Sequence, residues 1–190
     1  SIEIKLYDKL IETELILTYT IYENRPAITR HAKFYNNGSQ SVVIQNAMSA
    51  CVDLPDKEYE MIHLSGAWAR ERHVKKRKLE QGIQSVYSMR GASSAEHNPF
   101  LALKGYNTTE DAGEVYGFSL VYSGSFLGQI EVCSHDTTRV LIGIHPDTFS
   151  WRLNQGENFQ TPEVVMVYSD QGLNAMSQTY HELYRTRLVR

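Results

Sequence analysis

Alternating polar and apolar residues recur in short segments along most of the chain. Residues 13–23 (TELILTYTIYE) are rich in β-branched and aromatic side chains. Residues 27–36 (AITRHAKFYN) place every second residue from Ile28 to Phe34 on one face and every second residue from Thr29 to Tyr35 on the other. Further segments of this kind are SIEIKL, SVVIQNAMSACVDL, IQSVYSM, FLALKGY, VYGFSLVYSG, GQIEVCS, RVLIGIHP and PEVVMVYSD. Because strands follow one another with only turns between them, the sequence predicts a mainly β fold, an antiparallel two-sheet β-sandwich, and not βαβ units.

Turn and helix signals complete this outline. The stretch NNGSQ, Asn36–Gln40, contains an Asn-Gly pair that tolerates the positive φ of tight turns, so it predicts a β-hairpin. Towards the end of the chain, apolar residues recur at helical spacing from Leu173 onward. They predict one C-terminal α-helix over about 173–188, with Ser169 or Asp170 as its N-cap.

Composition limits the possible classes of protein. With 190 residues, 42% of them hydrophobic, the chain is long enough to bury the core of a single domain over 1–190. A formal net charge of −3 creates no general attraction for nucleic acid or an anionic membrane, and the sequence contains no apolar run of membrane-spanning length. The chain opens in a strand-like segment without an initiator Met and stops inside a helical pattern, which suggests a piece cut from a larger protein at both ends.

Cysteines and histidines point away from disulfides and metals. Cys51 and Cys133 lie far apart in β-like segments, so we expect buried, reduced thiols of a cytoplasmic protein, with a disulfide as the alternative. The seven histidines show none of the spacings that place two metal ligands on one element, and we expect neither a metal site nor another cofactor. These histidines are His31, His63, His73, His97, His135, His145 and His181.

Candidate chemistry is sparse. The basic run ARERHVKKRK, residues 69–78, could meet phosphates, but in a mildly acidic chain a solvated loop is the favoured interpretation. Ser93 and Ser94 lack the Gly-x-Ser-x-Gly frame of a nucleophile, and sequence spacing cannot show whether two carboxylates face each other across a sugar. Among the aromatic residues, Trp151 is expected in the core. Trp68, between Gly-Ala and charged residues, is the best candidate for an exposed sugar-stacking side chain.

Five ordered segments resemble a known family. They are IHLSGAWARER, RGASSAEHNPF, GEVYGFSLVYSGSFLGQIEV, GIHPDTFSWRLNQGENFQTPE and VYSDQGLNAMSQTYHELYRTRLVR. Together they resemble the amino-terminal β-supersandwich domain of family 36 α-galactosidases, retaining enzymes that cleave terminal α-galactose from melibiose- and raffinose-type sugars. The resemblance implies that the aspartate nucleophile and acid/base lie in a (β/α)₈ barrel that would follow this chain. It therefore implies a non-catalytic domain of a hydrolase of carbohydrate metabolism, with no catalytic residue here.

The resemblance also implies roles for four residues. In tetrameric members of the family, the tryptophan of the GAW segment reaches the sugar pocket of a neighbouring subunit, which makes Trp68 a substrate-binding residue of a homotetramer acting on galactose-containing oligosaccharides. Arg90, Ser94 and Asn98 of RGASSAEHNPF would support an interface or the pocket. Gly91 suits a tight turn and Asn98-Pro99 an extended exit, so an architectural loop is favoured over direct sugar contact.

Three alternatives stay open at this stage. The chain could be a stand-alone carbohydrate-binding module, which requires an exposed aromatic platform and sugar affinity without a barrel. It could instead be a purely structural oligomerisation domain, which self-associates without binding sugar. Relatives of the family that transfer galactose, such as raffinose synthase-like enzymes, would share the same domain.

Overall fold

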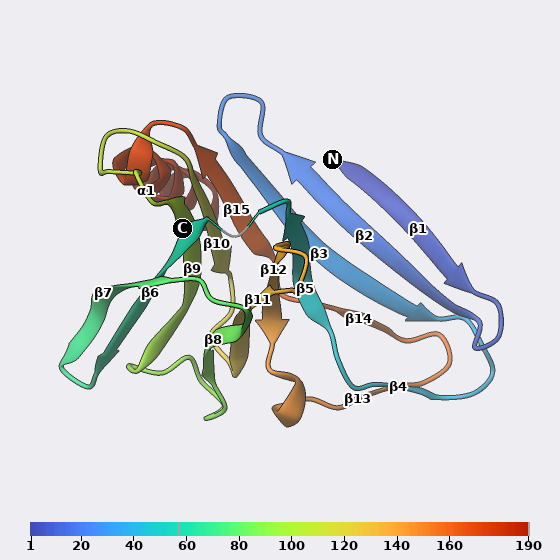
Figure 1. The fold of residues 1–190 in the computed structure, drawn as a ribbon. Helices are drawn as coiled ribbons and strands as arrows, with labels where there is room; N and C mark the ends of the chain where they lie inside the picture. The colour runs from blue at the N-terminus through green and yellow to red at the C-terminus, as the bar shows by residue number, and fades with distance from the viewer. Residues whose placement is uncertain (57, 190) are drawn as a thin grey trace.

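A long antiparallel sheet runs through the whole structure (Figure 1). The computed structural model describes residues 1–56 and 58–189. In spatial order the strands of this large sheet are β1 (Ile2–Asp8), β2 (Thr13–Ile21), β3 (Ala27–Asn36), β15 (Val164–Ser169), β10 (Val115–Leu120), β9 (His97–Gly105), β6 (Tyr59–Ala67) and β7 (Arg70–Lys78), and β14 (Asn158–Gln160) also pairs with β3.

A second, smaller sheet packs against the middle of the first. Its order is β5 (Met48–Leu54), β12 (Thr138–Ile144), β11 (Phe126–Val132) and β8 (Gly82–Ser88), and β4 (Val42–Ile44) and β13 (Trp151–Leu153) form a separate ribbon. The strand pairings of the three sheets are antiparallel. The predicted two-sheet sandwich is confirmed.

The core lies between these two sheets because alternate residues of their strands turn inward. Met61, Leu101 and Leu103 from the large sheet meet Phe126, Ile130 and Ile142 from the small one, and all six are fully buried. The small sheet does not reach β1 and β2, which form the far wing of the large sheet (Figure 1). Ile2, Ile4 and Leu6 of β1 are consequently about half exposed.

The predicted C-terminal helix is confirmed as α1 (Gly172–Leu183), which continues as a π-helical segment, η2 (Tyr184–Leu188). It packs on the outer face of the large sheet through Met176, Tyr180 and Leu183. Gly117 of β10 makes room for it, because a Cβ there would lie 2.8 Å from both the Met176 sulfur and the Tyr180 ring.

The predicted N-cap of this helix was wrong. Ser169 still belongs to β15, and the helix begins only after Gln171. Gln171 therefore occupies the N-cap position, where its side chain makes no capping bond. The Ser169 hydroxyl instead accepts a hydrogen bond from the Gln171 amide at 3.0 Å, which closes the turn between strand and helix.

The predicted hairpin at Asn36–Gln40 was also wrong. The strands on either side of it, β3 and β4, belong to different sheets, and Gly38 does not adopt a positive φ. The reason is the fully buried Asn36 side chain, whose Nδ2 donates to the Gln40 carbonyl at 2.7 Å and to the Leu153 carbonyl at 2.9 Å. The asparagine thus anchors a crossing between sheets.

Burial along β3 differs from the simple alternation that its sequence suggests. Ile28 is 37% exposed, whereas Ala27 and Thr29 are buried. Ala27 belongs to the apolar cluster beneath α1, while Ala32 and Phe34, on the opposite face, are covered to different degrees. The buried face changes along the strand because different layers cover its two ends.

Two further expectations about burial failed. Trp151 is 47% exposed on the β4–β13 ribbon, and its ring centroid lies 5.2 Å from that of Phe159. Both cysteines are free thiols, but neither is buried as expected: Cys51 is exposed on β5 and Cys133 is partly exposed. In the part of the chain that the structure describes, no helix is long and apolar enough to cross a membrane.

Candidate functional site

Trp68 stands at the tip of the hairpin formed by β6 and β7. With 88% of its surface exposed, it confirms the exposure expected from its small and charged neighbours. Trp68 and Ala69 make the two-residue turn, and Ala69 adopts a left-handed φ of 62°. A large indole that is left in solvent at a strained turn is typical of a contact residue and not of a core residue.

A β-bulge shapes the approach to this tip. The register between β6 and β7 shifts between Ser65 and Ala67. At Gly66 a Cβ would lie only 2.1 Å from the Arg70 carbonyl oxygen, so no other residue fits there without moving the backbone. Arg72 across the hairpin also has a positive φ of 61°. The bulge bends the last residues of the hairpin and thereby sets the direction of Trp68.

The basic run forms a strand and not the solvated loop that its composition suggested. Arg70–Lys78 is β7, exposed along its whole length at the free edge of the large sheet. Pairing with β6 decides its conformation, while its lysines and arginines keep it solvated. Charged residues on an edge strand also prevent the edge from pairing with other chains.

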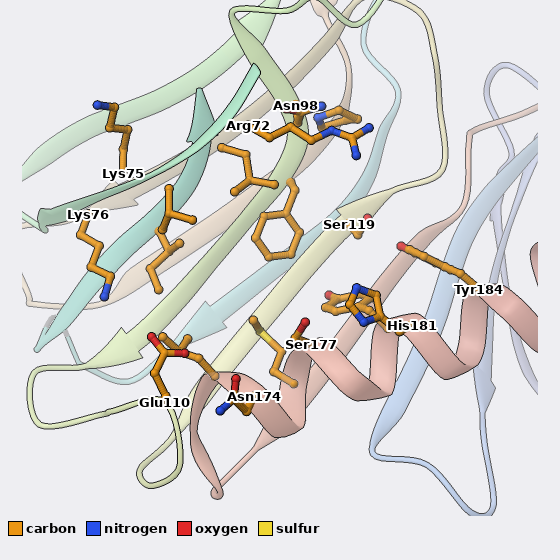
Figure 2. Close-up of a pocket in the computed structure, with 18 residues that line it drawn as sticks. Arg72, Lys75, Lys76, Asn98, Glu110, Ser119, Asn174, Ser177, His181 and Tyr184 are labelled. Carbon is orange, nitrogen blue, oxygen red and sulfur yellow. The ribbon is translucent and has the colours of Figure 1, made fainter. Parts of the chain in front are cut away.

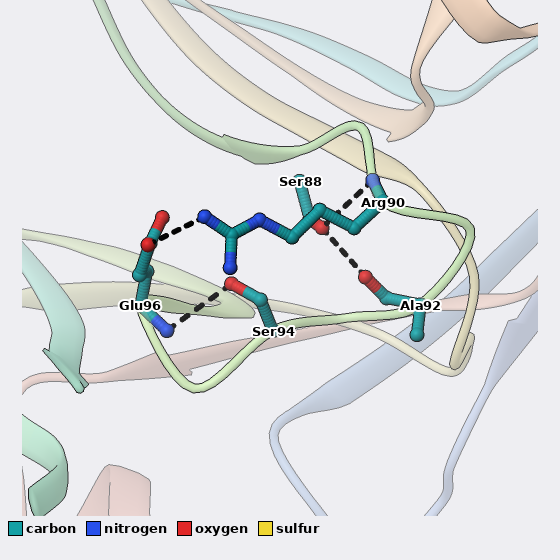
Figure 3. A network of polar contacts seen from close by, with 5 residues as sticks. All are labelled: Ser88, Arg90, Ala92, Ser94 and Glu96. Carbon is teal, nitrogen blue, oxygen red and sulfur yellow. Dashed lines mark hydrogen bonds and ion pairs between the residues drawn. The ribbon is translucent and has the colours of Figure 1, made fainter. Parts of the chain in front are cut away.

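The loop between β8 and β9 is closed by its own hydrogen bonds (Figure 3). Arg90 Nη2 donates to Glu96 Oε1 at 2.6 Å, and the Glu96 amide donates to the Ser94 hydroxyl at 3.1 Å. The Ser88 hydroxyl donates to the Ala92 carbonyl at 2.5 Å and accepts from the Arg90 amide at 3.4 Å. Arg90 and Ser94 therefore stabilise the loop itself.

Two predictions about this loop hold. Gly91 adopts a φ of 76° in a tight turn, and its amide donates to the Ser125 hydroxyl at 2.9 Å. Asn98 and Pro99 lie in the extended strand β9. The loop also meets the tryptophan hairpin, because the Gly66 amide donates to the Glu96 carbonyl at 2.9 Å. The structure thus brings the segments of Trp68 and Arg90 to one end of the sheet.

Asn98 faces a groove of about 1020 Å³ between α1 and the strands β6, β7 and β9 (Figure 2). Ile62, Phe100 and Met176 contribute to its apolar wall, and Arg72 and Lys76 add positive charge. Within residues 1–56 and 58–189, the buried Asn98 Oδ1 has no hydrogen-bond partner. Asn98 therefore differs from Arg90 and Ser94, whose side chains form hydrogen bonds within the loop.

A polar cluster missed by sequence reasoning lies beside the hairpin. His63 Nδ1 is 2.6 Å from the Ser65 hydroxyl, which is 2.8 Å from His97 Nδ1, and Arg77 Nη2 lies 3.0 Å from His63 Nε2. The spacing His63-x-Ser65 on one face of a strand was the available signal, but His97 joins only through the pairing of β6 with β9. Among the described residues, no group of three His, Cys, Asp or Glu side chains could hold a metal ion.

Burial and charge keep these histidines neutral. Burial, and then the nearby Arg77 guanidinium, lower the pKa of His63 to about 4. Burial likewise lowers the pKa of His97, although the Glu96 carboxylate opposes the shift. At pH 7 both imidazoles therefore act as neutral hydrogen-bonding groups.

These shifts predict a loss of stability in mild acid. Because the pKa of His63 is about 4 in the folded state but near its ordinary 6.5 in the unfolded chain, the unfolded state binds the proton first as pH falls. The free energy of unfolding should be fully present above pH 6.5 and fall by about 1–2 kcal/mol between pH 7 and pH 5. Urea unfolding of the 190-residue chain at both pH values measures it.

The matched variant for that measurement is His63→Gln, which cannot titrate. It should lose clearly less stability over the same interval, which lies above the range where carboxylates bind protons. Equal losses in the two proteins would show that His63 is not responsible.

The chain is similar to known proteins over its whole length. Residues 1–154 match the family profile described as "Glycosyl hydrolase family 36 N-terminal domain", and residues 158–190 match the one described as "Melibiase". The chain is 57% identical over 190 residues to alpha-galactosidase AgaA of Geobacillus stearothermophilus and 45% identical over 187 residues to alpha-galactosidase Mel36A of Lactobacillus acidophilus. It spans 26% of the length of each.

Solved structures give the same result. A crystal structure of a variant of AgaA from Geobacillus stearothermophilus in complex with stachyose superposes with a TM-score of 0.97 at 58% identity, over 99% of this chain and 26% of that one. The alpha-galactosidase from Lactobacillus brevis superposes with a TM-score of 0.95 at 43% identity, over 96% of this chain and 25% of that one.

Proposed function

Because this chain belongs to glycoside hydrolase family 36, as its N-terminal domain, we propose that it is the non-catalytic part of a retaining α-galactosidase. The full-length protein would hydrolyse terminal α-galactosyl residues of melibiose- and raffinose-type oligosaccharides. The observation that carries this proposal is 57% identity over the whole chain to an alpha-galactosidase. AgaA variants have been crystallised with raffinose and stachyose, which indicates the substrate class.

Three carboxylates of this domain that are held by basic side chains support a non-catalytic role. A retaining glycosidase needs two carboxyl groups about 5 Å apart, one of them able to donate a proton. Here Asp53, Glu60 and Glu96 each form an ion pair with a basic side chain. The hydrogen bond from Arg139 lowers the pKa of Asp53, which makes it a poor proton donor. Catalysis would belong to the barrel domain that follows α1.

Trp68 would border the galactose subsite of a neighbouring subunit in a homotetramer. Its indole is 88% exposed at a hairpin tip, so the described residues of its own domain leave most of the flat apolar ring uncovered. A sugar ring offers the apolar C–H face that such an indole stacks on, while the indole N–H can donate to a hydroxyl.

The groove beside α1 would receive part of the catalytic barrel. The Melibiase match begins at residue 158 and includes α1, so the helix that lines the groove belongs to the segment that would lead into the barrel. Asn98 also lines this groove, so it would lie beside the docked part of the barrel. The half-exposed apolar side chains of β1 would be covered in the same way by the rest of the full-length protein.

The two free cysteines are consistent with a reducing compartment, and we place the protein in the cytoplasm. Cys51 is exposed, where a thiol would oxidise readily outside the cell.

Activity separates this proposal from its rivals. The full-length protein should hydrolyse an aryl α-galactoside, melibiose and raffinose, while the 190-residue chain should show no turnover because it lacks the nucleophile and the acid/base. The measurement is release of the aryl alcohol or of free galactose. Turnover by the 190-residue chain that responds to substitutions in it would overturn the assignment.

The exposed Trp68 is also the platform that a stand-alone carbohydrate-binding module would need. Calorimetric titration of the 190-residue chain with galactose and melibiose, combined with light scattering, tests that alternative. One indole without the polar groups of the barrel forms one side of a site, so we expect no measurable affinity. Saturable binding would favour the module, and self-association without binding would favour an oligomerisation domain.

A further inference from the structure

A row of polar side chains continues the sandwich core towards the tryptophan hairpin. We infer that Arg77, Ser65 and the two histidines beside them are positioning residues that fix the Trp68 hairpin against the loop at residues 89–96. This inference rests on the proposed role of Trp68 and adds the groups that hold it in place. Their contacts, named above, join three neighbouring strands, β7, β6 and β9.

The direction of these hydrogen bonds starts from Arg77. A guanidinium has donors and no acceptor, so Arg77 donates to His63 Nε2, and the neutral His63 must carry its proton on Nδ1. His63 Nδ1–H then donates to the Ser65 oxygen, and the Ser65 O–H donates to His97 Nδ1. In this arrangement each proton of the hydrogen-bond chain has one acceptor, and the Arg77 donor sets the tautomer of His63.

The position of these side-chain hydrogen bonds explains why the hairpin needs them. Met61 on β6 is fully buried in the core, but β7 is exposed along its whole length, so apolar packing does not hold the outer hairpin. Ser65 directly precedes the bulge at Gly66, and the Gly66 amide bonds to the Glu96 carbonyl. Loss of these side-chain bonds leaves the tip oriented by backbone pairing at a sheet edge and by the exposed hydrogen bond from the Ala69 amide to Glu71 Oε1 at 2.9 Å.

Protonation of His63 would break this chain of hydrogen bonds. The charged groups around the rings are Arg77 and Lys75 from β7 and Glu96 from the loop just before β9. Two aromatic rings also lie near the histidine pair, those of Tyr87 from β8 and His145 after β12. The Tyr87 ring centroid is 6.4 Å from that of His97 and 5.6 Å from that of His145. A second proton on His63 would place Nε2–H against the Arg77 donor, so the contact would become repulsive.

The test is a double-mutant cycle in the full-length protein. Arg77→Met should lower kcat/KM for an aryl α-galactoside by about 3- to 10-fold. In a Trp68→Ala background the same substitution should cause no further loss, because the network acts through the hairpin. Lys78→Met, which removes one positive charge from the same strand without touching His63, should have little effect. Arg77→Lys, which keeps a donor, should recover part of the activity.

The pH profile supplies a readout that simple loss of stability would not change. Without Arg77, His63 binds a proton more readily, so the acid limb of kcat/KM should begin at a higher pH in Arg77→Met than in the wild type. Ser65→Ala, which interrupts the chain at its centre, is the second variant if Arg77→Met does not fold.

The outcomes separate the inference from the proposed function. If Trp68→Ala alone leaves kcat/KM unchanged, the proposed role of Trp68 fails. If Trp68→Ala lowers kcat/KM but the losses from Trp68→Ala and Arg77→Met multiply, or the acid limb does not move, the positioning role is wrong and the role of Trp68 stands.

Discussion

Trp68→Ala in the full-length protein is expected to lower kcat/KM for an α-galactoside by about 5- to 150-fold, which corresponds to about 1–3 kcal/mol of transition-state stabilisation. The substitution removes the stacking face that would cover the galactose in a neighbouring subunit. The fold should barely change, because a side chain that is 88% exposed contributes little to the core. Steady-state kinetics and the thermal unfolding midpoint measure the two effects.

Two variants control this experiment. Trp68→Phe keeps a flat ring without the indole N–H and should retain more activity than alanine. Trp151→Ala removes the other tryptophan, which lies on the β4–β13 ribbon away from the β6–β7 hairpin (Figure 1), and should leave kcat/KM close to the wild type. A Trp68→Ala protein that unfolds while its sugar kinetics stay intact would show that the residue is structural.

Tyr180→Ala should destabilise the 190-residue chain by about 3–5 kcal/mol, the range for removal of a large buried aromatic side chain. Tyr180 is 5% exposed and packs edge-on against Phe100 at 5.9 Å, directly over Gly117. Its hydroxyl donates to the Val165 carbonyl at 3.1 Å. The substitution opens a cavity between α1 and the large sheet. Urea unfolding followed by circular dichroism gives the free energy.

Tyr180→Phe is the matched control, since it removes only the hydroxyl and keeps the ring. Its cost should be about 1 kcal/mol, the typical net value of one buried hydrogen bond. If the two variants lose equal stability, the hydrogen bond and not the packing of the ring holds α1. A loss below 1 kcal/mol in Tyr180→Ala would mean that the helix does not depend on this contact.

The sequence alone determined the layer type, the C-terminal helix and the exposure of Trp68. Each depends on residues near one another in the chain. A period of two favours a half-buried strand, and spacing of three and four residues from Leu173 favours an amphipathic helix. Gly66 and Ala67 leave Trp68 uncovered by its neighbours, and the charged residues that follow keep the segment in solvent. The family was inferred from five sequence motifs that occur in the same order as in its members.

Tertiary structure decided the rest, because strand order and coverage depend on contacts between distant residues. Asn36 anchors a crossing between sheets by bonding to Leu153, 117 residues away, which no local turn preference reveals. The basic run became a strand through its pairing with β6, and Trp151 became half exposed on an edge ribbon. Ser65 and His97, 32 residues apart, meet only because β6 pairs with β9 in one register. Local propensity sets the conformation of a segment, but its neighbours and its buried face are set by how the whole chain packs.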